Sequence, residues 1–260
     1  MARRLQIDLF LLGAIVVLVV FGLAMVFSAS AVVATEQYGS SLHFVIRQAI
    51  WAVLGLVIMW RLMSFDYRRF RNPRLIFPAL ALEVCLLVVV FLMPVRHDTH
   101  RWFYSGPFSF QPSELAKVLL LIFFAYFLDR QRDAINDIRH TLAPMGIVMG
   151  AMVALILKEP DLGTSLAIVM IAAAMLFAAG LQFRYFAGAA VAAVPLLYVA
   201  ITHATYRTNR LIAFLNPEGD PLGKGFQILQ SLIAVGSGGI LGVGFGEGHQ
   251  KLFFLPEPQT

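Results

Sequence analysis

The chain has 260 residues, of which 59% are hydrophobic and only 13% are charged. Soluble domains carry roughly 25% charged residues, so this composition excludes an ordinary water-soluble protein and indicates a chain that is solvated mostly by lipid. The net charge of +5 is distributed over short segments between apolar stretches, which argues against a nucleic-acid-binding surface, and the single cysteine excludes an internal disulfide.

The first apolar stretch, Leu9–Phe27, contains no charged residue and follows two arginines. It is long enough to cross a hydrocarbon core of about 30 Å. Residues 29–31 (Ala-Ser-Ala) are similar to a signal-peptidase site. The apolar region of a signal peptide is only about 7–15 residues long, so the length favours a retained helix over a cleaved signal.

Six more apolar stretches follow, separated by short polar connections. They cover residues 44–63, 75–95, 113–128, 142–157, 162–181 and 186–202. The sequence therefore predicts an all-α polytopic membrane protein with about seven transmembrane helices, followed by a long C-terminal loop. Residues 1–203 form the helical part in this interpretation, and residues 204–260 form the loop.

The distribution of lysine and arginine predicts the orientation. With a cytoplasmic N-terminus, the short connections on the inner side hold eleven of these residues and those on the outer side hold four. Because positive charge concentrates in cytoplasmic loops, residues 204–260 are expected on the extracytoplasmic side.

The predicted terminal loop is rich in glycine, with seven glycines between Gly236 and Gly248. Such loops allow close backbone approach to phosphate or to a sugar. Apolar residues at 226, 229 and 233 predict a short amphipathic helix inside this otherwise irregular connection. The segment lacks the spacing of known nucleotide-binding motifs, and the histidines lack metal-ligand spacing, so the motifs identify no cofactor.

One group of polar residues lies between the third and fourth apolar stretches. Arg101-Trp102 is followed by Pro112-Ser113, where Ser113 is a plausible helix N-cap. Glu114 and Lys117 then fall on one face of the helix, three residues apart. They could form a self-satisfying ion pair at the interface, or they could serve a binding site.

A second group, Glu159 and Asp161, lies in the tight turn between the fifth and sixth stretches. Asp161 can cap the following helix, whereas Glu159 has no such structural role. Glu83, in the middle of the third stretch, is expected to face a cavity or a partner helix. Arg47, at the outer end of the second stretch, either reaches lipid headgroups or faces the same cavity as Lys117.

Cations and carboxylates at the outer rim, beneath a glycine-rich loop, suit a lipid-linked diphosphate whose tail stays in lipid. Several of these motifs also resemble the SEDS family (shape, elongation, division and sporulation proteins), which includes FtsW, RodA and SpoVE. The similar segments are residues 27–30, 101–102, 110–117, 159–164, 216–239 and 255–257. Gln250-Lys251-Leu252 is more similar to the FtsW branch than to the RodA branch.

The resemblance implies a peptidoglycan glycosyltransferase of the bacterial inner membrane that polymerises lipid II with inversion, beside a class B penicillin-binding protein and other division proteins. It implies that positive charge on the leaving diphosphate comes from Arg101 and Lys117, with Arg47 and Arg210 as further candidates. Glu114, Glu159 and Asp161 would line the site with Trp102 and orient these cations.

The chain departs from the family pattern at its end. Members resemble ten-helix proteins in which Leu-Pro-Glu-x-His-Thr is followed by an aspartate, the proposed catalytic base. Here the sequence reads Leu-Pro-Glu-Pro-Gln-Thr and stops at Thr260. We therefore expect no catalytic residue within these 260 residues and an inactive N-terminal fragment. A lipid-linked-precursor flippase and a non-catalytic membrane scaffold are the alternative functions.

Overall fold

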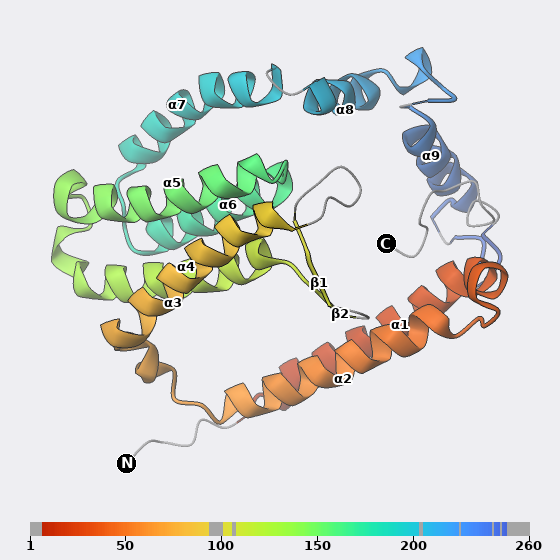
Figure 1. Cartoon of the computed structure of the whole chain (residues 1–260), viewed down its shortest axis with the longest axis horizontal. Coiled ribbons are helices and arrows are strands. Elements are labelled where there is room, and N and C mark those ends of the chain that lie inside the picture. The colour runs from red at the N-terminus through yellow and green to blue at the C-terminus, as the bar shows by residue number, and fades with distance from the viewer. Residues whose placement is uncertain are drawn as a thin grey trace. The chain divides into compact units, whose positions relative to one another are not determined.

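The computed structural model describes residues 7–93, 101–105, 108–202, 205–223, 225–240, 242–244 and 246–248. Figure 1 shows the helices and strands of the chain. The chain divides into two compact units, one formed by residues 66–195 and the other by residues 1–65 together with residues 196–260.

In the second of these units, α1 (Leu9–Tyr38) packs along α2 (His43–Met63), and the two helices lie side by side in Figure 1. Gly39 ends α1 in the left-handed conformation, with φ of 70°, which allows the chain to reverse. The Tyr38 and His43 rings stack across the turn with centroids 4.0 Å apart. Apolar side chains on both helices are exposed, as lipid-facing helices require.

The unit of residues 66–195 contains four packed helices and a small hairpin. Its elements are η1 (Tyr67–Arg71), α3 (Pro73–Val89), η2 (Val90–Leu92), β1 (Phe103–Ser105), β2 (Phe108–Phe110), α4 (Pro112–Arg130), η3 (Arg132–Ala134), η4 (Ile138–Leu142), α5 (Ala143–Lys158), α6 (Leu162–Ala178) and the first part of α7 (Phe183–Thr202).

The core of this unit lies among α3, α4, α5 and α6, where α4 contacts the other three helices. Leu87, Phe123, Met152 and Ile156 are almost fully buried there. Proline at the first position of α3 and of α4 fixes the backbone where its missing N–H costs nothing. Close packing of these side chains holds the helix ends, and therefore the polar groups at those ends, in fixed positions.

The last part of the chain is more regular than the sequence predicts. The helix expected near residues 226–233 is confirmed as α9 (Phe226–Gly238), but α8 (Thr205–Leu215) and η5 (Pro217–Gly219) were not predicted. A Cβ atom at Gly225 would lie 2.0 Å from the Pro217 carbonyl oxygen, so only glycine fits the turn that begins α9.

The predicted all-α membrane architecture is confirmed. Four helical segments of the described ranges are long and apolar enough to cross a membrane, namely residues 9–38, 43–63, 73–92 and 138–158. α4 is 19 residues long, and α6 and α7 are apolar as well. The chain is thus a multi-pass membrane protein. Two expectations need correction: α1 continues eleven residues beyond Phe27, and a β-hairpin lies between α3 and α4.

Candidate functional site

The hairpin brings the two halves of the first polar group together. β1 and β2 are antiparallel with Phe103 opposite Phe110, so Arg101-Trp102 before β1 lies alongside Gln111 after β2. No alternating pattern in this segment is long enough to predict these three-residue strands. Antiparallel pairing nevertheless explains how Arg101 reaches the start of α4.

Arg101 binds the turn between α5 and α6. Its Nε donates a hydrogen bond to the Glu159 backbone oxygen at 2.7 Å, and its Nη2 donates to the Pro160 backbone oxygen. The guanidinium therefore satisfies two carbonyl groups at the C-terminal end of α5, where positive charge is favourable. The second polar group is held against the hairpin by this contact.

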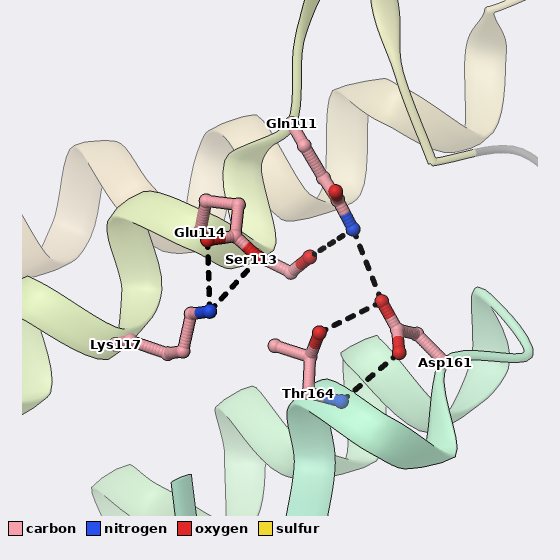
Figure 2. Close-up of polar contacts among 6 residues, drawn as sticks. All are labelled: Gln111, Ser113, Glu114, Lys117, Asp161 and Thr164. Atoms are coloured by element: carbon pink, nitrogen blue, oxygen red, sulfur yellow. Dashed lines mark hydrogen bonds and ion pairs between the residues drawn. The ribbon is translucent and has the colours of Figure 1, made fainter. Parts of the chain in front are cut away.

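Asp161 joins the starts of two helices (Figure 2). Its carboxylate accepts hydrogen bonds from the backbone N–H of Thr164 at 3.0 Å and from the Thr164 hydroxyl at 2.9 Å, which confirms the predicted N-cap of α6. It also accepts from the Gln111 side-chain amide at 3.0 Å, and the same amide donates to the Ser113 hydroxyl at 2.8 Å. Asp161 is only 8% exposed, so these neighbours occupy the carboxylate.

Gln111 lies in the family-like segment 110–117, but the sequence interpretation assigned it no role. The structure makes it the N-cap residue of α4, although its side chain makes no capping hydrogen bond, and it corrects the expectation that Ser113 is the cap. Ser113 is instead fully buried inside the helix. A glutamine just before a helix-starting proline was the available signal, but only the tertiary contact with Asp161 reveals its role.

Glu114 and Lys117 form the ion pair that their spacing predicts. The Lys117 ammonium lies 2.8 Å from the Glu114 carboxylate, and both side chains lie on the first turns of α4 (Figure 2). The Lys117 side chain is 27% exposed and that of Glu114 is 56% exposed. Lys117 also lines a pocket between α4 and α6 that is otherwise apolar, with Leu120, Phe124 and Met175 among its walls. This places a cation at the edge of an apolar surface.

Glu159 is fully buried, and neither of its carboxyl oxygens has a hydrogen-bond partner among the described residues. The pKa of its carboxyl is raised from 4.5 to about 8, chiefly because the group is buried; the Asp161 carboxylate and Glu83 also raise this pKa, and Arg101 lowers it. Glu159 therefore binds a proton near neutral pH. Its backbone oxygen, rather than its side chain, contacts Arg101.

The predicted site residues fall in both units. Arg101, Trp102, Glu114, Lys117, Glu159 and Asp161 belong to the unit of residues 66–195. Arg47 on α2 and Arg210 on α8 are exposed and belong to the other unit. Their participation stays a prediction. Residues 249–260, which carry the last family-like segment, lie outside the described residues.

Within the part of the chain that the structure describes, no group of three or more His, Cys, Asp or Glu side chains is placed to hold a metal ion. The polar residues that do come together are cations, carboxylates and an amide, which suit the recognition of anionic and hydroxyl groups.

Residues 9–260 match the FTSW_RODA_SPOVE family model, described as "Cell cycle protein". The chain belongs to this family. A relative in Geobacter metallireducens, named "Probable peptidoglycan glycosyltransferase FtsW", is 41% identical over 97% of this chain and 68% of its own length. The family member "Stage V sporulation protein E" of Bacillus subtilis is 39% identical over 99% of this chain and 71% of its own length.

Solved structures agree with this family assignment. One, described as "Structural coordination of polymerization and crosslinking by a peptidoglycan synthase complex", is 30% identical, with a TM-score of 0.62 over 85% of this chain and 65% of that chain. The rod shape determining protein RodA of Thermus thermophilus is 26% identical, with a TM-score of 0.50 over 68% of this chain and 58% of its own. The chain thus spans roughly two thirds of the length of these relatives.

Proposed function

We propose that this chain is the substrate-binding part of an FtsW-like peptidoglycan glycosyltransferase, which polymerises lipid II during cell division. The observation that carries the proposal is the position of Lys117, an ammonium group at the edge of an apolar pocket between two membrane helices. A polyisoprenyl diphosphate needs this combination, because its phosphates require a cation and its tail requires an apolar surface. Relatives named as peptidoglycan glycosyltransferases support the reaction class.

In this proposal some site residues contact the substrate, and the others keep those residues in position. Lys117 carries the positive charge toward the leaving diphosphate, and Glu114 orients its ammonium group. Arg101, Glu159 and Asp161 fix the hairpin and the α5–α6 turn next to the start of α4. In this proposal Trp102 belongs to the same substrate-binding surface as Lys117, and the roles of Arg47 and Arg210 stay predictions from the sequence.

The proposed setting follows the distribution of charge. The N-terminus lies in the cytoplasm, the protein crosses the bacterial inner membrane, and residues 204–260 lie outside the cytoplasm. There the emerging glycan would meet a cross-linking partner of the class B penicillin-binding type. The coupling of polymerisation and cross-linking named for a structural neighbour supports this partnership.

The binding step is tested with the purified 260-residue chain in lipid nanodiscs. Undecaprenyl diphosphate is titrated against wild type, K117A and E114Q, with uncharged undecaprenol as the ligand control. We expect K117A to weaken diphosphate binding at least about tenfold, since one charge-assisted contact contributes about 1.5–3 kcal/mol, and to leave undecaprenol binding unchanged. Equal affinity of wild type and K117A for the diphosphate would contradict the proposal.

The reaction itself is tested by incubating the chain with lipid II. If residues 1–260 form glycan strands, the inactivity expected from the sequence is wrong. Movement of labelled lipid II across liposomes by the chain would instead favour the flippase alternative. Recruitment of the cross-linking partner by a K117A chain that has lost diphosphate binding would favour the scaffold alternative.

A further inference from the structure

Two carboxyl groups are buried without partners inside the unit of residues 66–195. Glu83 on α3 and Glu159 at the end of α5 are both fully buried. All four of their carboxyl oxygens lack a hydrogen-bond partner, and they are the only buried side-chain polar atoms in this condition among the described residues. Buried polar groups are normally hydrogen-bonded, so two such carboxyls in one unit require an explanation.

The two groups lie on helices that contact each other. α3 packs against α5, and Glu83 acts electrostatically on Glu159. The other charged groups that act on Glu159 are Asp161, from the start of α6, and Arg101, from before β1. The Arg101 guanidinium is directed to backbone oxygens of the turn rather than to the Glu159 carboxylate.

Two ionised carboxylates would be unstable in this position. Each buried ion that lacks a partner costs several kcal/mol, and the two negative charges would also repel each other. A metal ion would relieve this repulsion, but the described residues offer no group of three suitable side chains. A proton neutralises a carboxylate without any further ligand.

We propose that Glu83 and Glu159 form a proton-binding pair that keeps the α5–α6 turn packed against α3. While the pair holds its proton, the turn presents the two backbone oxygens that bind Arg101. Loss of this proton leaves both carboxylates charged and loosens the turn together with the Arg101 contact. The contacts of Arg101 and Asp161 at the start of α4 are therefore coupled to pH through this buried pair. The coupling does not depend on which substrate Lys117 binds.

The sign of the pH effect follows from Glu159. Its pKa is about 8 in the folded chain and 4.5 when it is unperturbed, so folding takes up a proton between these values. The contribution of Glu159 to the free energy of unfolding is fully present below about pH 4.5 and is lost as the pH rises toward about 8. Within that window the unfolding equilibrium constant should increase by up to about tenfold per pH unit.

The first experiment detects the bound proton directly. Infrared spectra of the detergent-purified chain at pH 6 to 7 should show the C=O stretch of a buried protonated carboxyl group, and the band should disappear as the pH passes about 8. E159Q and E83Q should each remove or shift this band. The matched control E36Q, which changes an exposed glutamate on α1, should retain it.

The second experiment follows thermal unfolding of the same proteins from pH 5 to pH 9. The melting temperature of wild type and E36Q should fall as the pH rises, and E159Q and E83Q should flatten that dependence. An unchanged slope in both variants, or no protonated band in wild type at pH 6, would overturn the proposal. It would also be overturned if Mg²⁺ or Mn²⁺ stabilised wild type but not E83Q, because the pair would then bind a metal ion.

Discussion

Replacing Asp161 by alanine should separate the starts of α4 and α6. Removal of an N-cap side chain costs about 0.5–2 kcal/mol, and loss of a buried hydrogen bond to a charged group costs about 1.5–3 kcal/mol. Asp161 provides both, the cap through Thr164 and the second bond through Gln111. We therefore expect D161A to lower the free energy of unfolding by about 2–5 kcal/mol, and D161N, which keeps one oxygen acceptor, by about half as much.

The assay is an equilibrium unfolding titration of the 260-residue chain in mixed micelles, followed by circular dichroism. D66A is the matched control, because Asp66 caps η1 in the same unit but is exposed. It should cost less than about 1 kcal/mol. A double-mutant cycle of Q111A with D161A should give a coupling of about 1 kcal/mol. Additive effects, or a D161A cost equal to that of D66A, would show that Asp161 is only a local cap.

Three other substitutions test a helix core and two turns. R101A should cost about 1–3 kcal/mol in the same titration because it leaves two backbone oxygens of the α5–α6 turn without their donor, and R101K should recover little since an ammonium group cannot replace the guanidinium fork. L87A should cost about 2 kcal/mol through the cavity that it leaves in the core, whereas L82A, on the exposed face of the same helix, should cost much less; equal costs would contradict the observed core. G225A should destabilise the turn before α9 by about 1–3 kcal/mol, and G236A, with open space around its Cβ position, should be neutral or stabilising by up to about 1 kcal/mol; the reverse order would refute the turn geometry.

Local features of this protein could be predicted because they depend on neighbours in the sequence. Long apolar stretches must be helical in lipid, since every backbone polar group has to be satisfied within the segment, and the structure confirms helices in all seven predicted stretches. The Glu114–Lys117 pair and the Asp161 cap follow from spacings of three residues, and both are present. The family resemblance was equally local, because it was based on short segments, and residues 9–260 match the family model.

Contacts between distant segments had to come from the tertiary structure. Gln111 and Asp161 are fifty residues apart, and no periodicity in the sequence indicates that their side chains share a hydrogen bond. The hydrogen bond of Arg101 to the α5–α6 turn and the electrostatic effect of Glu83 on Glu159 could not be predicted either, because each depends on how four helices pack. The sequence by itself determined which segments enter the membrane and which residue types lie at their ends, since hydrophobicity and capping act over a few residues. Only the packing decided which of those residues line the pocket between α4 and α6, which hold the helices together, and which carboxyl groups are removed from water.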